Sequence, residues 1–248
     1  AYSFAQGGAG VIQWVWNVNC FVKSDNEAAI GYFKADGTKK MELEVQKGFA
    51  DFFAGMAPYM KERIKEDVVM IVPQSMHYSV LGPSNEITRR VVDIIQYHLD
   101  IAVNAVGEYD MDALDYTPKL MVVPSSQMLC DDAWQHLLDK CRDGAVLLFT
   151  GPFDKNEYWM DTDRMMQLGI EGRTRVISRE EPVMVKDKKF ILDYKGDDYW
   201  THYVDVLDFP EGNNLVEIPF GAGKVIVFSH PVEISANQNA AEAVYGYA

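Results

Sequence analysis

The middle of the chain alternates short apolar segments with amphipathic ones, and this alternation constrains the fold more than any other feature. Segments 67–75, 119–126 and 145–151 are apolar, whereas 84–100 and 130–144 carry apolar residues at helical spacing. Successive strands joined through a helix pair in parallel, because a long crossover is needed to return the chain to the same edge. The sequence therefore predicts a parallel sheet with helices packed on its faces.

The predicted helix after the first of these strands carries its own start and pairing signals. Ser84 is placed to cap its first turn, and Glu86 stands four residues before Arg90. Opposite charges at this spacing meet on one face of a helix. We therefore expect the helix to begin at Ser84 and to carry a salt bridge along its surface.

The first 60 residues predict a β–loop–α unit. Segment 9–19, AGVIQWVWNVN, reads as a strand buried on both faces, followed by a loop with a turn at Asp36–Gly37 and by an amphipathic helix over 41–63. Trp14 and Trp16 would share one face of that strand, because side chains alternate along it. A buried strand of this kind is typical of the last strand of a larger sheet, so we expect further strands beside it.

The last third of the chain changes character. Segments 174–194 and 199–209 combine β-branched and aromatic residues with charged turns, which favours antiparallel strands. Segment 213–231 reads as a hairpin that ends in a buried strand, and 235–248 as a terminal helix. The glycines of FGAGK, residues 220–224, lie between two strands and predict a turn rather than a phosphate-binding loop.

Composition excludes several classes of partner. The chain has 248 residues, 48% of them apolar, which suffices for one large domain or two smaller ones. A net charge of −14 repels phosphate backbones and anionic lipid surfaces, so neither nucleic acid nor a membrane is expected as a partner. No apolar run approaches the length of a membrane helix, and we expect a cytoplasmic protein.

No motif for a cofactor, a metal or a nucleophile stands out. A dinucleotide fingerprint is missing after the first strand of the alternating region, and the five histidines are not spaced as metal ligands. An amidotransferase nucleophile would occupy a turn after a central strand, where this chain has Gly151. Cys130 stands beside two aspartates that would raise its pKa, and the three cysteines are expected to be reduced. His230 follows a buried strand, where a local hydrogen bond is the expected role.

With these parts in order, the chain resembles the C-terminal portion of glycoside hydrolases of family 42, the β-galactosidase-like enzymes of the (β/α)8 clan. GGAGVIQWVWN resembles the last barrel strand, and IGYFKADGTKKMELEVQKGFADFF the closing loop and last helix. KLMVVPSSQMLCDDAWQHLLDKCRDGAVLLFTG resembles the strand–helix–strand core of the second domain. The fold implied is the terminal β–α unit of a (β/α)8 barrel, followed by a flavodoxin-like, class I glutamine-amidotransferase-like parallel-sheet domain with a β-rich extension.

The resemblance implies domain boundaries at 1–62 for the barrel unit and 63–248 for the amidotransferase-like domain, with a β-rich insertion over about 157–222. It implies that this chain is the C-terminal fragment of a retaining, β-galactosidase-like enzyme that binds a carbohydrate. The second domain would serve homo-oligomer formation, and the aromatic loops 156–161 and 197–203 would face a partner subunit or a sugar.

The resemblance also assigns residues. Trp16 best matches the strand-eight tryptophan under the sugar that is cleaved, Trp14 is the competing candidate, and Asn17 lies just beyond. The two catalytic glutamates of the clan belong to strands four and seven, so no catalytic residue is assigned in this chain. Glu27, in the loop after the strand, is expected to be a solvated loop acid.

An alternative interpretation is a non-enzymatic, amidotransferase-like module that binds a ligand or a protein at the carboxyl edge of its sheet. The crevice there would be rimmed by Gln74, Ser75, Ser125, Ser126, Thr150 and Gly151. The two interpretations differ in what they expect of the tryptophans. A self-contained module buries Trp14 and Trp16, whereas a glycosidase fragment leaves them on an incompletely covered face.

Overall fold

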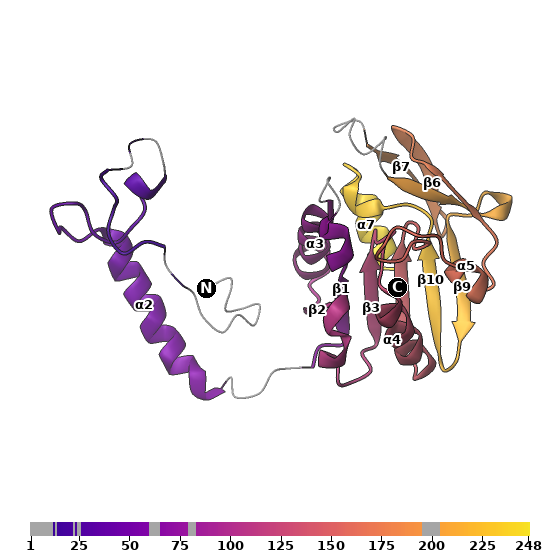
Figure 1. Cartoon of the computed structure of the whole chain (residues 1–248), viewed down its shortest axis with the longest axis horizontal. Helices are drawn as coiled ribbons and strands as arrows, with labels where there is room; N and C mark the ends of the chain where they lie inside the picture. Colours follow the sequence, from indigo (N-terminus) through magenta and orange to yellow (C-terminus); the bar gives the residue numbers. More distant parts are fainter. Residues whose placement is uncertain are drawn as a thin grey trace. The chain divides into compact units, whose positions relative to one another are not determined.

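The computed structural model divides the chain into two units, Ala1–Ile64 and Lys65–Ala248. It describes residues 12, 14–21, 23, 26–59, 65–78, 83–194 and 204–248. The first unit holds one long helix, and the second holds the sheet with its covering helices (Figure 1). No helix within these described ranges is long and apolar enough to cross a membrane.

The first unit consists of helix α2, two short 3-10 turns and an irregular segment. Helix α2 spans Met41–Met56, and the turns are η1, Asn26–Ala28, and η2, Ala57–Tyr59. The helix begins where the sequence predicts but tightens into the 3-10 turn that contains Pro58. Proline removes a backbone donor and crowds the preceding turn, so a regular helix does not continue through it.

Segment 9–19, expected to be a buried strand, does not form one in its described part. The sole described pairing there is a bridge between Asn17 and Phe33. Trp14 and Trp16 are 68% and 61% exposed. A strand is stable when neighbouring strands take its hydrogen bonds and cover its faces, and the described part of this unit offers segment 9–19 a single bridge.

The second unit is built on a six-stranded sheet in the order β2-β1-β3-β4-β10-β9. All neighbours pair in parallel except β9, which joins β10 antiparallel at the edge. Counting β10 as the fifth parallel strand, this is the flavodoxin-like order 2-1-3-4-5, and the predicted fold class is confirmed. The strands are β1 Val68–Val72, β2 Val103–Gly107, β3 Leu120–Pro124, β4 Val146–Thr150, β9 Leu215–Phe220 and β10 Gly223–Phe228.

Helices cover both faces of this sheet, so its central strands β1, β3 and β4 are apolar without alternation. The longer ones are α3 Pro83–Val92, its π-helical continuation η4 Asp93–His98, α4 Asp131–Arg142 and α7 Gln238–Tyr245. Side chains alternate along each strand: Leu147 and Phe149 of β4 share a core with α4, and Leu148 shares the opposite core with α3, η4 and α7. Short helical turns occur at η3 Gln74–Tyr78, η5 Glu108–Ala113, α5 Arg164–Gln167, η6 Pro210–Gly212 and η7 Val232–Ile234.

Helix α3 corrects one local prediction and confirms another. It begins at Pro83, so Ser84 lies inside the first turn and is not the N-cap. Proline suits this first helical position, because its missing N–H would have no intrahelical partner there. The predicted pair is present, with Arg90 Nε donating to Glu86 Oε1 at 2.7 Å.

The β-rich extension forms two separate antiparallel pairs, β5 with β8 and β6 with β7. Their bounds are β5 Arg173–Val176, β6 Glu180–Val185, β7 Lys188–Asp193 and β8 Asp205–Asp208. The predicted FGAGK turn joins β9 to β10. Gly221 has a φ of +62°, and a Cβ there would lie 2.5 Å from the Arg142 Cα, so the hairpin requires glycine at this position.

Candidate functional site

Trp16 presents an exposed aromatic ring on a backbone held by hydrogen bonds. Its carbonyl accepts the amides of Tyr32 at 2.8 Å and Phe33 at 3.3 Å. Its ring centroid lies 5.8 Å from that of Tyr32, edge-on, and 5.2 Å from that of Phe33. Tyr32 is buried. The Trp16 ring is therefore fixed by two aromatic neighbours and remains largely open, which suits an aromatic platform for a ligand.

The three predicted binding residues lie on one short segment. Asn17 is exposed and forms the bridge to Phe33, next to the contacts that hold Trp16. Trp14 is the more exposed of the two tryptophans. The structure thus brings Trp16 and Asn17 together around residues 32–33, whereas the side chain of Glu27 lies outside the described part.

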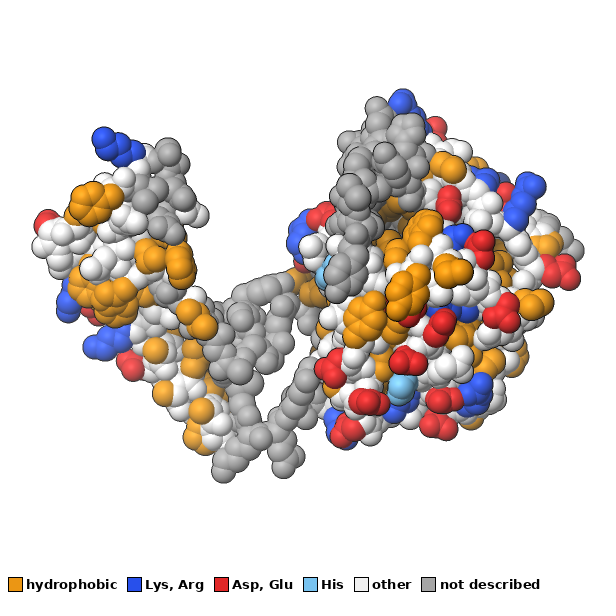
Figure 2. All heavy atoms as spheres, in the orientation of Figure 1, with side chains coloured by type: hydrophobic (Ala, Val, Ile, Leu, Met, Phe, Trp, Pro, Cys, Tyr) orange, Lys and Arg blue, Asp and Glu red, His pale blue; other side chains and the backbone are white. Residues whose placement is uncertain are grey.

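Helix α2 presents its apolar side chains without burying them. Phe53 stacks on Phe49 with centroids 6.0 Å apart and meets Phe52 edge-on at 5.6 Å, yet no residue of α2 is buried in this unit. Hydrophobic side chains gather along the helix (Figure 2). A helix of a folded domain ordinarily buries such a stripe, and the described part of the first unit leaves it exposed.

The carboxyl edge of the sheet holds a buried carboxylate. Glu233, in η7, is 1% exposed and accepts three side-chain hydroxyls, from Ser125, Thr150 (2.6 Å) and Tyr245. The Ser125 amide in turn donates to the Thr150 hydroxyl at 2.8 Å. Ser125 has a φ of +42°, a left-handed conformation that non-glycine residues rarely adopt. The network therefore joins the ends of β3 and β4 to α7, and both oxygens of the Glu233 carboxylate accept a hydrogen bond.

Burial raises the pKa of Glu233 above its ordinary value of 4.5, although the three hydroxyl groups partly counteract it. The folded state then holds this proton more tightly than the unfolded state. Its contribution to stability is complete below about pH 4.5 and is lost as the pH rises through the raised pKa. Relative to Glu233→Gln, the wild-type free energy of unfolding should fall as the pH rises, by about 1.4 kcal/mol per unit of raised pKa, in urea titrations from about pH 4.5 to 8.

Glu86→Gln supplies the control with the opposite sign. The arginines Arg90 and Arg89 lower the pKa of Glu86, so its contribution to stability is present above about pH 4.5 and is lost as the pH falls. Parallel stability curves for wild type and Glu233→Gln across the whole range would contradict the assigned role of Glu233.

The residues predicted to rim the crevice are mostly turned inward. Ser75 is buried, and its amide donates to the carboxylate of Glu108, which is 1% exposed and also accepts the Cys130 amide at 3.1 Å. Gln74 Oε1 accepts the Tyr109 amide at 3.2 Å. Ser126, Thr150 and Gly151 are buried as well. Within the described residues these groups stabilise loop geometry at the strand ends.

Cys130 serves as the N-cap of α4, its sulfur accepting the Ala133 amide at 3.4 Å. Burial raises the pKa of its thiol, and the carboxylates of Glu108, Glu157 and Asp132 raise it further. A raised pKa disfavours the thiolate that a nucleophile requires. The geometry therefore fits the structural role expected from the sequence.

His230 makes the local hydrogen bond that the sequence predicts. Its Nδ1 lies 2.7 Å from the hydroxyl of Ser229, and its Nε2 lies 3.5 Å from Glu181 Oε2. The Ser125 hydroxyl donates to Glu233 and not to His230, so the described contacts assemble no serine–histidine pair at the left-handed turn after β3. Across the described residues, no three His, Cys, Asp or Glu side chains are grouped to hold a metal ion.

The sequence and the structure were compared with those of known proteins. No family model and no curated protein matches the sequence. A catalytic mutant of Gan42B, a GH42 β-galactosidase from G. stearothermophilus, is similar in structure, with a TM-score of 0.68 at 10% identity over 94% of this chain and 36% of that one. A β-galactosidase from Bacillus circulans sp. alkalophilus gives 0.65 at 11% identity, over 94% and 39%. An exo-β-1,4-mannosidase from Opitutaceae bacterium strain TAV5 gives 0.61 at 15%, over 95% and 45%.

At these identities the likeness concerns the fold. The chain shares the fold of a part of the GH42 β-galactosidases, which confirms the predicted resemblance at this level. It spans between 36% and 45% of the length of the three enzymes.

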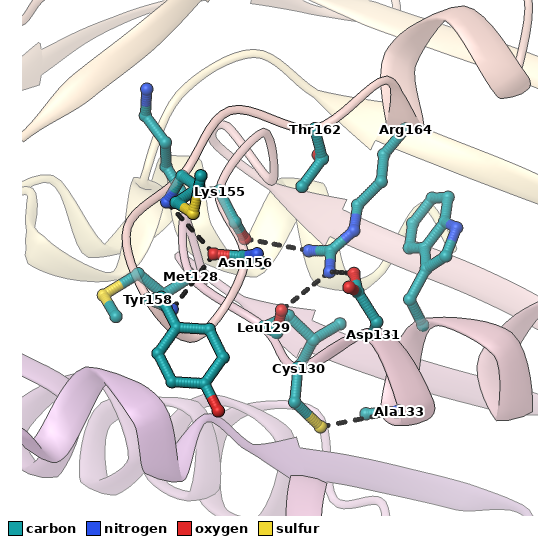
Figure 3. Close-up of polar contacts among 12 residues, drawn as sticks. Met128, Leu129, Cys130, Asp131, Ala133, Lys155, Asn156, Tyr158, Thr162 and Arg164 are labelled. Atoms are coloured by element: carbon teal, nitrogen blue, oxygen red, sulfur yellow. Dashed lines mark hydrogen bonds and ion pairs between the residues drawn. The ribbon is translucent and has the colours of Figure 1, made fainter.

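An aromatic loop projects from the second unit and is anchored by a buried arginine. Arg164 is 1% exposed and donates to the carbonyls of Leu129 (2.7 Å) and Lys155 (2.9 Å) and to the carboxylate of Asp131 (2.7 Å), as Figure 3 shows. Asn156 Oδ1 accepts two amides of the loop tip at 3.0 Å each. The tip itself is exposed: Tyr158, Trp159 and Met160. The second predicted aromatic loop, 197–203, lies outside the described residues.

Two clusters were not predicted from the sequence. Glu233 meets hydroxyls from residues 108 and 83 positions earlier and 12 positions later. Glu181 is bound by Arg175, whose Nη1 and Nη2 donate to its two oxygens at 2.6 and 2.9 Å. In the sequence, the SHPVE segment after β10 indicated a polar group at a strand end, but it led to a prediction for His230 and not for Glu233 or Glu181.

Proposed function

We propose that this chain is the C-terminal portion of a larger carbohydrate-active enzyme that hydrolyses β-galactoside-like substrates with retention. The coverage supports this: 94% of the chain aligns with 36% of a GH42 β-galactosidase. In this proposal residues 1–62 complete a (β/α)8 barrel, and residues 63–248 form the amidotransferase-like domain that serves oligomerisation. The acid and nucleophile glutamates belong to the remainder of the enzyme, and a cytoplasmic location stays a prediction.

The observation that carries the proposal is the exposure of Trp16 on a fixed backbone. A self-contained module would bury its tryptophans, whereas Trp16 is 61% and Trp14 68% exposed. In the proposed enzyme the Trp16 ring stacks on the apolar face of the sugar, and the amide of Asn17 bonds a hydroxyl. The uncovered apolar face of α2 is what a helix of an outer barrel ring presents to its neighbours.

The experiment is to express the longest reading frame that contains this sequence and to measure hydrolysis of 4-nitrophenyl β-D-galactoside. We expect Trp16→Ala to lower kcat/KM by about 10- to 100-fold, because the lost contact supports the sugar in the transition state. Trp14→Ala tests the competing candidate. Tyr97→Ala, which removes an exposed aromatic ring of η4 in the second unit, is the matched control and should leave kcat/KM unchanged.

The alternative, a non-enzymatic binding module, makes the opposite forecast. An expressed protein of the mass of this chain, with no hydrolysis of any nitrophenyl glycoside, would support the module. If the longer protein hydrolyses the substrate and neither Trp14→Ala nor Trp16→Ala changes the rate, the tryptophans do not belong to the substrate site. The proposed enzyme class would still hold.

A further inference from the structure

A small acidic notch lies between η5, the start of α4 and the aromatic loop 156–161. Its volume is about 240 Å³. Small-molecule sites span about 300–1,000 Å³, so the notch is too small for a cofactor or a drug-sized ligand, and its size suits a single side chain of a partner. Five carboxylates contribute to its lining: Glu108, Asp112, Asp131, Asp132 and Glu157.

Two of these five carboxylates have a basic partner within the protein. His136 Nε2 lies 3.3 Å from Asp112, and Arg164 lies 2.7 Å from Asp131. Both partners are already engaged elsewhere: His136 Nδ1 contacts a backbone carbonyl of α4, and Arg164 also donates to two carbonyls. These two bases are therefore not available to balance the remaining acids.

The other three carboxylates face the notch without a cation. Asp132 and Glu157 form no ion pair with a described residue, and the buried Oε2 of Glu157 has no hydrogen-bond partner among them. Glu108, which is 1% exposed, accepts the amides of Ser75 and Cys130. Burial raises the pKa of the Cys130 thiol, and the charges of all three carboxylates raise it further. The electrostatic potential in the notch is therefore negative and attracts a cation.

Exposed aromatic rings border the notch. Tyr109 is exposed and belongs to its lining. Tyr158 is exposed as well, and its ring points to the same side of the loop as the side chain of Cys130, as Figure 3 shows. Because Arg164 holds the base of this loop, the tip loses little freedom when a partner binds. Aromatic residues of this kind are typical anchors of protein interfaces.

The arrangement of the acids favours a guanidinium over a metal ion. Across the described residues, no three acidic, histidine or cysteine side chains are grouped closely enough to hold a metal. A guanidinium spreads five donors over a plane, and its face stacks on aromatic rings. It therefore suits carboxylates that stand apart from one another beside a tyrosine.

We propose that the notch binds an arginine of a partner protein, and that apolar residues beside this arginine pack on Tyr109 and Tyr158. The guanidinium pairs with Asp132, which is exposed, and with the half-buried Glu157, while Glu108 adds its charge from below. The partner is a protein other than this chain, because a net charge of −14 repels a second copy and attracts a basic segment. This proposal does not depend on the proposed enzyme activity.

The test begins by selecting random peptides of about 12 residues, displayed on phage, for binding to the 248-residue chain. Enriched peptides should contain an arginine next to aliphatic or aromatic residues. We expect the most enriched peptide, synthesised with a fluorescent label, to bind with a Kd of about 1–100 μM, and more weakly at about 500 mM than at about 50 mM NaCl. Replacement of its arginine by glutamine should weaken binding at least about tenfold.

Two pairs of variants assign this binding to the notch. Asp132→Asn should weaken it at least about tenfold, whereas Asp139→Asn removes the same charge from the same helix outside the notch and should bind as wild type. Tyr158→Ala should also weaken binding, and Tyr97→Ala, which removes an exposed ring of η4, should not. All four side chains are exposed, so the core stays intact in each variant.

Several outcomes would overturn the proposal. These are a selection that enriches no arginine-containing peptides, or unchanged binding in either Asp132→Asn or Tyr158→Ala. A change in the oligomeric state of the chain in these two variants, measured by sedimentation, would mean that a second copy occupies the notch, and the proposal would again be wrong. Hydrolysis by the longer protein is a separate readout, so a failure here leaves the proposed function in place.

Discussion

Replacing Trp134 with alanine is expected to lower the free energy of unfolding by about 3–5 kcal/mol. The indole is 1% exposed, its ring centroid lies 5.8 Å from that of Phe149 and 5.7 Å from that of Phe153, and its Nε1 donates to Gln167 Oε1 at 2.9 Å. Removal leaves a cavity between α4 and the sheet that these aromatic rings cannot close. Urea unfolding followed by far-UV circular dichroism measures the loss.

Trp159→Ala serves as the control for this prediction. Trp159 is 50% exposed at the tip of the aromatic loop, so its removal should change the unfolding free energy by less than about 1 kcal/mol. Equal losses in the two variants would mean that Trp134 does not fill the core as described.

Replacing Arg164 with methionine is expected to destabilise the protein by about 3 kcal/mol, because two carbonyls lose a charged donor that is itself buried, and the ion pair with the largely exposed Asp131 is lost as well. The carbonyls are those of Leu129 and Lys155, which Arg164 holds together with Asp131. Once they are released, the loop that carries Tyr158 should be cut faster by chymotrypsin. Urea unfolding and the rate of that cleavage measure the two effects.

Arg89→Met is the matched control for the arginine. Its guanidinium is 64% exposed and pairs with Glu86 and Asp93 on the surface of α3, so a much smaller loss than in Arg164→Met is expected. Unchanged cleavage of the loop in Arg164→Met would show that other contacts hold it. Because the Arg164 guanidinium lies 5.3 Å from the Trp134 ring centroid, the effects of the two large-effect substitutions should not add.

The fold of the second unit followed from local patterns. Segments 67–75, 119–126 and 145–151 became β1, β3 and β4, because a strand covered on both faces must be apolar throughout, and this shows in the sequence. The turn at 220–224 was equally visible, since Gly221 adopts a left-handed conformation. The same logic failed for 9–19, because an apolar segment becomes a strand only beside other strands, and pairing is a tertiary property.

Some features of the candidate sites could likewise be predicted from the sequence, and others could not. The sequence by itself determined that Trp14, Trp16 and Asn17 are neighbours on one segment and that His230 stands at a strand end with a local partner. Only the tertiary structure decided that Glu233 receives three hydroxyls and that Glu181, held by Arg175, lies beside His230. Such contacts depend on where the strand ends and loops converge in the folded sheet. The spacing of residues along the chain does not predict these contacts, because the hydrogen-bond partners of a buried polar group come from distant parts of the sequence.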